Sequence, residues 1–156
     1  MTAEEYLSQV RKIDVRIEYL SREIQNLKAL SYSLHTIVPE REHVRTSPGD
    51  AGYAQVLVRL ADMEKQMLAE VDLMISLKSQ AREIVSQLRN PDLEAILLGF
   101  YLEGQNQVRI GEQLHMHRTA VSKKRKLALS LLIIPDNAIQ IDKTFFSPPD
   151  SNDKND

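Results

Sequence analysis

A regular spacing of apolar side chains constrains the first part of this chain more than any other feature. From Thr2 to Val38, apolar residues recur at alternating intervals of three and four, with Ser31 at the one gap in the row. This heptad repeat is typical of a left-handed coiled coil, in which the repeating positions form one seam. At about 1.5 Å per residue, the helix would be roughly 50 Å long. The central seam positions, which are our candidate self-association residues, are Val10, Ile13, Ile17, Leu20, Ile24 and Leu27.

Helix-terminating signals define the ends of this segment and of a second one. Thr2 followed by Glu5 has the spacing of a capping box, which predicts that the first helix begins at once. Pro39 ends it, and the stretch 39–53, which contains Pro and Gly and lacks an apolar period, is predicted to be a loop. A second apolar row follows, with a break in its heptad spacing at Val71.

Two long helices joined by one loop are expected to fold back on each other. Residues 1–89 are therefore predicted to form an antiparallel coiled-coil hairpin, in which the second helix runs from about Tyr53 to Arg89. Two helices alone bury little apolar surface, so we expect the chain to be a homo-oligomer. The pattern leaves open whether the coils pair within one chain or between chains.

Composition excludes several function classes. The chain has no cysteine, which excludes disulfides and thiolate metal sites. It has no phosphate-binding loop, dinucleotide fingerprint or convergent acid–base residues, so we expect a non-enzyme without a cofactor. The polar N-terminus is unlike a signal peptide, and no apolar run approaches the ~20 residues that span a bilayer. We therefore expect a cytoplasmic protein with no membrane partner.

Residues 90–132 are predicted to form a module of three short helices. Asn90 is a plausible N-cap for a helix over 91–102, and Gly104 a plausible residue to end it. Two further helices are expected over about 108–114 and 118–132. The fold class is therefore all-α, a long hairpin followed by a module over residues 90–132. Residues 133–156 are predicted to be a largely disordered acidic tail.

Residues 108–132 carry the functional motif, VRIGEQLHMHRTAVSKKRKLALSLL, with six basic residues and one acidic residue. Its apolar residues are spaced as in a helix-turn-helix, and Gly111 falls where the two helices approach closely. In such a motif the second helix enters the major groove of DNA through its N-terminal outer face. The predicted DNA-binding residues are His117, Arg118, Thr119, Ser122, Lys123, Arg125 and Lys126.

Residues 90–132 resemble the helix-turn-helix of sigma factor region four. The start MTAEEYLSQVRKID, the second coil and this module together resemble small phage transcriptional regulators of Gram-positive bacteria, namely late-transcription activators of the RinA and ArpU kind and their uncharacterised relatives. The resemblance covers roughly residues 1–132. It implies a phage or prophage regulator in a bacterial host cell, with double-stranded DNA as partner and a coiled coil that self-associates or contacts RNA polymerase.

Three departures from the family pattern keep other interpretations open. His115 stands where the turn usually has Gly, Lys124 stands where an Ile or Leu is normal, and an apolar residue is shifted to Val108. One alternative is a DNA-packaging protein similar to a terminase small subunit. The other is a coiled-coil adaptor or inhibitor that binds only protein. We expect no metal site at His115 and His117, because one intervening residue within a turn is poor ligand spacing.

Overall fold

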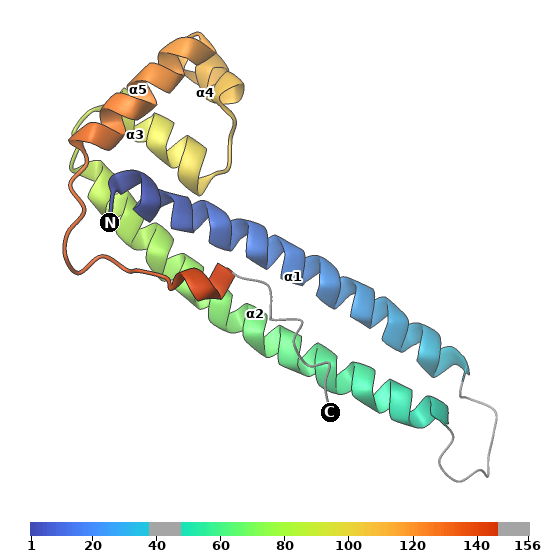
Figure 1. The fold of residues 1–156 in the computed structure, drawn as a ribbon. Helices are drawn as coiled ribbons and strands as arrows, with labels where there is room; N and C mark the ends of the chain where they lie inside the picture. Colours follow the sequence, from blue (N-terminus) through green and yellow to red (C-terminus); the bar gives the residue numbers. More distant parts are fainter. Residues whose placement is uncertain (38–47, 147–156) are drawn as a thin grey trace. The chain divides into compact units, whose positions relative to one another are not determined.

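Helices make up all the regular secondary structure in the part of the chain that the structure describes. The computed structural model describes residues 1–37 and 48–146, with the side chains of all of them except 35–37 and 48–51. Within these ranges there is no β-strand, which confirms the predicted all-α fold. The elements are α1 (Ala3–Ile37), α2 (Pro48–Ser86), α3 (Pro91–Leu97), the π-helical turn η1 (Leu98–Leu102), α4 (Gln107–Leu114), α5 (Arg118–Leu131) and the 3₁₀ turn η2 (Lys143–Phe146) (Figure 1).

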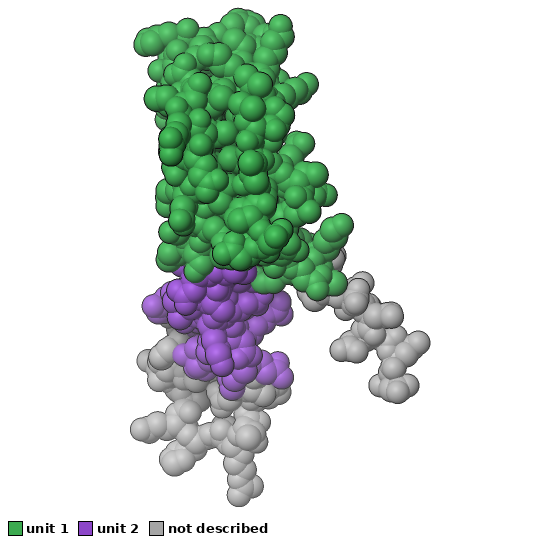
Figure 2. Space-filling model, turned by 90° about the vertical axis from the view of Figure 1, so that its left-hand side faces the viewer, with its two compact units in different colours: residues 1–14, 74–156 green, residues 15–73 purple. Residues whose placement is uncertain are grey.

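The chain divides into two compact units, coloured green and purple in Figure 2. Unit 1 contains residues 1–14 and the chain from residue 74 onward, and unit 2 contains residues 15–73. Each unit holds part of α1 and part of α2, while the module predicted over residues 90–132 lies wholly in unit 1. In residues 1–37 and 48–146, no helix combines the length and apolar composition that crossing a membrane requires.

In unit 2 the segments of α1 and α2 run antiparallel. Arg16 of α1 pairs with Glu70 of α2, and Lys28 pairs with Glu64 at 3.2 Å, so the partner moves back along α2 as α1 advances. The same direction holds in unit 1, where Asp14 of α1 pairs with Lys78 of α2 at 2.9 Å. The predicted helical hairpin is therefore formed within one chain.

The predicted seam of α1 packs against α2 of the same chain. In unit 2, Leu20 and Ile24 of α1 form an apolar cluster with Met63 of α2. The partly buried side chains of Leu27, Leu60 and Met67 pack against this cluster. The pairing that the sequence left open is therefore within one chain for this part of the seam. Of the six predicted positions, the buried ones are Val10, Ile13, Leu20 and Ile24, and the half-buried ones are Ile17 and Leu27.

The seam of α2 differs from its prediction at one position. The apolar pattern puts Val71 in the seam and a break in the heptads, but the structure buries Glu70 there and leaves Val71 half-buried. With Glu70 included, the seam keeps its alternating spacing, and the break disappears.

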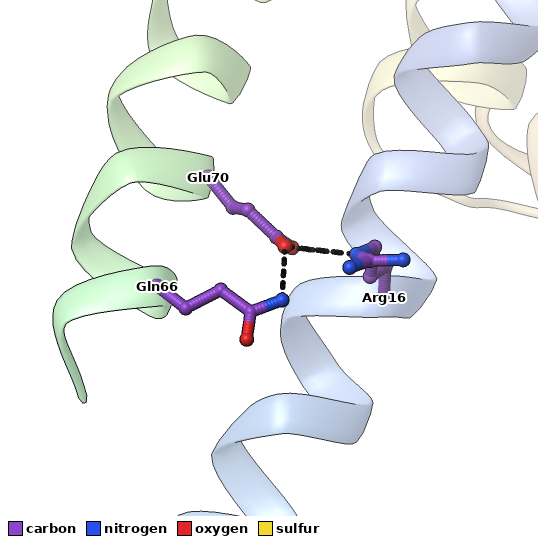
Figure 3. A network of polar contacts seen from close by, with 3 residues as sticks. All are labelled: Arg16, Gln66 and Glu70. Carbon is purple, nitrogen blue, oxygen red and sulfur yellow. Dashed lines mark hydrogen bonds and ion pairs between the residues drawn. The ribbon is translucent and has the colours of Figure 1, made fainter. Parts of the chain in front are cut away.

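Glu70 is buried because two side chains satisfy its carboxylate. Nε of Arg16 lies 2.9 Å from both carboxylate oxygens of Glu70, and Nε2 of Gln66 donates to Oε1 at 3.0 Å (Figure 3). An unpaired charge in a protein interior costs several kcal/mol, so a carboxylate is tolerated in this seam only with such partners. A pattern of apolar residues in the sequence does not reveal these polar partners of Glu70.

The second long helix begins earlier than predicted. The predicted loop over 39–53 is wrong from Pro48 onward, because α2 already starts at that residue. Proline is well tolerated at the first helical position, where its missing N–H has no partner to lose. The remainder of the predicted loop, residues 39–47, lies outside the described residues.

The capping box predicted at the start of the chain is confirmed. The backbone N–H of Glu5 donates to Oγ1 of Thr2 at 3.1 Å, and the backbone N–H of Thr2 donates to Oε2 of Glu5 at 2.8 Å. These hydrogen bonds to Thr2 lower the pKa of the Glu5 carboxyl below its ordinary value. The first turn of α1 is therefore closed by its own side chains.

The module of unit 1 is built from α3, η1, α4 and α5 around one small core. Ile96, Ile110 and Val121, one from each of the three α-helices, form this core, and Phe100, Leu114 and Met116 pack around it. Asn90 caps α3 as predicted, accepting from the backbone N–H of Asp92 at 3.1 Å. The expected helix over 91–102 ends in η1, and Gly104 follows with φ 67°, the left-handed conformation that ends helices.

Residues 133–146 correct the prediction of a largely disordered tail, because they pack against α1 and α2 within unit 1. Gln80 accepts from the backbone N–H of Ile139 at 2.8 Å, and Gln9 accepts from that of Ile141 at 2.6 Å. Ala138, which lies along the chain between α5 and these two contacts, is also buried. Two glutamine amides thus provide the hydrogen bonds that an extended chain needs. Residues 147–156 of the predicted tail lie outside the described residues.

Candidate nucleic-acid interface

The turn between α4 and α5 is held by caps on both sides. Asn106 caps α4 by accepting from the backbone N–H of Arg109 at 2.8 Å. His115 ends α4 with φ 56° and ψ 43°, a left-handed conformation in which Gly is the usual residue. His117 then caps α5, because its Nδ1 accepts from the backbone N–H of Thr119 at 3.2 Å. The predicted start of the second helix at about residue 118 is confirmed.

The close approach predicted at Gly111 is present. A Cβ atom at this position would collide with the carbonyl oxygen of Met116 and would lie 3.5 Å from Cγ2 of Val121. The backbone N–H of Met116 donates to the carbonyl oxygen of Gly111 at 2.8 Å. The glycine therefore allows α4, the turn and α5 to pack against one another, which fixes the direction of α5.

The two sides of α5 differ sharply in character. Val121 and Ala128 are fully buried on the inner side. No acidic residue occurs in α5, so its outer side presents positive charge without internal compensation. Of the predicted DNA-binding residues on this helix and its cap, those exposed to solvent are His117, Arg118, Thr119, Lys123 and Lys126, and Ser122 is half-buried.

The cap of α5 also orders the polar groups at its start. Nδ1 of His117 lies 3.0 Å from Oγ1 of Thr119, in addition to accepting from the backbone N–H of the same residue. Because Nδ1 accepts from the backbone, the proton of the neutral ring is on Nε2, which leaves Nε2 as an N–H donor. Arg118, next to this cap, lies in the first turn of α5.

Lys124 occupies a position where the family pattern has an apolar residue, and the structure shows how the charge is accommodated. Its side chain is 41% exposed, and Nζ lies 3.7 Å from Oδ2 of Asp92 in the first turn of α3. The amine thus leaves the core and pairs across the module. This contact directs Lys124 away from the exposed basic residues of α5.

Arg125 differs from the other predicted DNA-binding residues, because its guanidinium packs inside unit 1. Its Cζ lies 4.3 Å from the ring centroid of Phe100, and Cζ of Arg11 of α1 lies at the same distance from that ring. Cation–π contacts of this kind hold a guanidinium in place. Arg125 is only partly exposed. This contact sets the predicted DNA-binding residue Arg125 apart from the exposed basic residues of α5.

The histidines of the turn form no metal centre with neighbouring residues. Among the residues whose side chains the structure describes, 1–34 and 52–146, no group of three or more His, Cys, Asp or Glu is arranged to hold a metal ion. His115 and His117 instead have the backbone roles described above. The site therefore consists of a shaped basic surface on one helix.

Comparison with known proteins found no relative of this chain. A scan against protein-family models found no matching family, and neither the curated proteins nor the solved structures contain a match to this chain.

Proposed function

We propose that this protein is a DNA-binding transcription regulator of the phage or prophage kind, in which α5 enters the major groove. The observation that carries the proposal is the two-sided character of α5. One side is locked into the module by Val121 and Ala128, and the other presents exposed basic and hydroxyl side chains from Arg118 onward. This is the arrangement that a recognition helix requires.

The exposed residues divide into two proposed roles. Arg118 and Thr119, in the first turn, contact base edges, because an arginine can donate two hydrogen bonds to guanine and a threonine methyl can touch thymine. Ser122, one turn later, contributes a third polar group to this region. Lys123 and Lys126 bind phosphates, which adds affinity that depends on salt but contributes no sequence preference.

The hairpin has a separate proposed role. It carries self-association or a contact with RNA polymerase, while the module of unit 1 carries DNA binding. In this account the protein works in the cytoplasm of a bacterial host cell on double-stranded DNA, without a cofactor and without catalysis.

Fluorescence anisotropy tests the proposal. The purified protein is titrated into a labelled duplex from the DNA upstream of its own operon and into a scrambled duplex of the same composition, over a series of salt concentrations. The proposal requires tighter binding to the first duplex and an affinity that falls steeply with salt. Absence of binding to either duplex at low and ordinary salt would contradict it.

An adaptor that binds only protein is the second candidate, and one observation favours it. Among the described residues of unit 2, exposed large apolar side chains outnumber buried ones, which is a property of surfaces that contact other proteins. In that case, reversing the charge of Arg118 and Lys123 would leave the protein's activity unchanged, whereas a regulator that uses α5 would lose its activity.

A further inference from the structure

The hairpin of unit 2 has a thin core and an apolar outer surface. Among the described residues of this unit, only Leu20, Ile24 and Met63 are buried apolar residues. Seven large apolar side chains in the same part of the unit are exposed, so much of its apolar surface is left uncovered. They are Val15, Tyr19, Leu30, Tyr32, Leu57, Val58 and Leu68.

Part of this surface forms a regular stripe along α2. Leu57, Ala61 and Leu68 are separated by four and seven residues, which places them on one side of the helix. This side is turned by about 100° from the side on which Met63 and Met67 pack against α1, so the stripe flanks the intrachain seam. Glu64 lies on the same side as the stripe and pairs with Lys28 of α1. Leu57 is 40% exposed and Leu68 is 68% exposed, although leucine is normally buried in a folded protein.

Two opposite charges border the stripe on the side that lies farther from α1. Lys65 and Asp72 are seven residues apart, so they share one edge of the helix. Both are exposed, and neither has an ion pair with another described residue. In the same helix Glu64 is already paired with Lys28. The border of the stripe thus carries one free positive charge before Leu68 and one free negative charge after it.

We propose that this side of α2 binds the same side of a second copy, with the two α2 helices antiparallel and a two-fold axis at Leu68, so that Leu57 and Ala61 of each copy lie opposite the part of α2 that follows Leu68 in the other. Such an axis brings Leu68 of one copy against Leu68 of the other. It also brings Lys65 of each copy opposite Asp72 of the other, at levels that differ by about 1.5 Å along the helix. Two intermolecular ion pairs then border one apolar contact, and the same surface serves both partners.

The charges select this occupant and this direction. In a parallel pair, whose two-fold axis runs along the helices, Lys65 of one copy and Asp72 of the other lie on opposite sides of the contact, so they cannot pair. The antiparallel arrangement brings both Lys65–Asp72 pairs to one side of the contact, where each lysine faces an aspartate. The proposed dimer involves the hairpin alone, so it does not depend on DNA binding by α5.

Charge exchange tests the arrangement through the mass of the protein in solution. Lys65→Glu and Asp72→Lys each place like charges opposite one another, and sedimentation equilibrium should show a dimer dissociation constant raised at least tenfold in either variant. The double variant Lys65→Glu/Asp72→Lys restores opposite charges and should restore the dimer. A monomeric wild-type protein, or single and double variants equally weakened, would overturn the proposal. Circular dichroism verifies that each variant keeps its helices.

Cysteine cross-linking tests the register, because the natural chain has no cysteine. Leu68→Cys places the two sulfurs at the axis, where oxidation should give a disulfide-linked dimer. Leu57→Cys places them eleven residues from the axis on opposite sides, about 33 Å apart along the helices, so it should not cross-link. Cross-linking of both variants would indicate a parallel pair, and cross-linking of neither would show that this stripe is not the contact. Either result contradicts the proposed dimer.

Discussion

The guanidinium of Arg16 forms a short ion pair with the buried carboxylate of Glu70, with Nε 2.9 Å from both carboxylate oxygens. The Glu70 side chain is 4% exposed and the Arg16 side chain is 27% exposed, so the pair is largely shielded from water. It stands in a seam whose neighbouring members are methionines. Methionine side chains adapt to many packings, whereas a buried ion pair accepts few alternatives. We therefore expect this pair to help define the register of α1 against α2 in unit 2.

Removal of one partner should be far more damaging than removal of both. Arg16→Ala leaves the Glu70 carboxylate buried and unpaired, which should lower the free energy of unfolding by about 3 kcal/mol. The double variant Arg16→Met/Glu70→Met replaces the pair by apolar side chains and should be close to wild type in stability. Urea unfolding followed by circular dichroism measures both. Equal destabilisation by the single and double variants would show that the charges matter less than packing.

The turn before α5 should be strained at His115, because φ is 56° there. His115→Gly removes the contact between Cβ and the backbone, so it should stabilise the protein by about 1 kcal/mol. Gly104, with φ 67° and open space around the position that a Cβ would take, is the matched control. Gly104→Ala should destabilise by a similar amount in the same thermal unfolding experiment. A destabilised His115→Gly variant would reveal a stabilising contact of the imidazole.

Gly111 should tolerate no side chain at all. Gly111→Ala drives a methyl group against the carbonyl oxygen of Met116, and we expect a loss of about 1–3 kcal/mol in unfolding free energy. Gly52, in α2, is the control, because a Cβ there meets no atom within 4 Å. Gly52→Ala should stabilise by about 0.5–1 kcal/mol through helix propensity alone. Chemical denaturation measures the free energy of unfolding of both variants. A Gly111→Ala variant as stable as the wild-type protein would contradict the close packing of α4 and α5.

Tyr6 should make the stability of the protein sensitive to alkaline pH. Its side chain is fully buried, its hydroxyl donates to Oε1 of Gln80 at 2.9 Å, and burial raises the pKa of Tyr6 to about 12. The unfolded chain loses this proton near pH 10. The stability contributed by the neutral phenol is therefore complete below about pH 10 and is lost as the pH rises towards 12.

Tyr6→Phe isolates this effect. At neutral pH the variant loses one hydrogen bond, which should cost about 1 kcal/mol. Between pH 10 and 12 it should lose less stability than the wild-type protein, because it has no phenol to ionise. Urea unfolding across this range measures the difference. Identical pH profiles for the two proteins would show that Tyr6 ionises without linkage to folding.

Local signals in the sequence were sufficient for the helix boundaries that depend on neighbouring residues. Thr2 with Glu5 and Asn90 both cap helices as their spacing predicts, because each cap involves side chains two or three residues from their partners. The helix-turn-helix spacing also placed Gly111 correctly at the close contact.

Features that depend on distant partners were missed. Glu70 is buried only because Arg16 reaches it, and residues 137–141 are ordered only because Gln9 and Gln80 supply hydrogen bonds. Similarly, Arg125 looks like a phosphate-binding residue in the basic run, and only its contact with Phe100 shows that it points elsewhere. These partners are 54 to 132 positions apart in the first two cases, beyond any periodic pattern.

The most direct test of the central claim compares Arg118→Ala with Lys124→Ala in the anisotropy assay on the operon-upstream and scrambled duplexes. Both changes remove one positive charge from α5, but only Arg118 is free at the exposed N-terminal turn, since Lys124 is paired with Asp92. Arg118→Ala should cost about 1–3 kcal/mol on the upstream duplex and reduce discrimination between the two, whereas Lys124→Ala should keep discrimination intact. Equal effects of both variants, or no effect of Arg118→Ala, would contradict the assignment of α5 as the recognition helix.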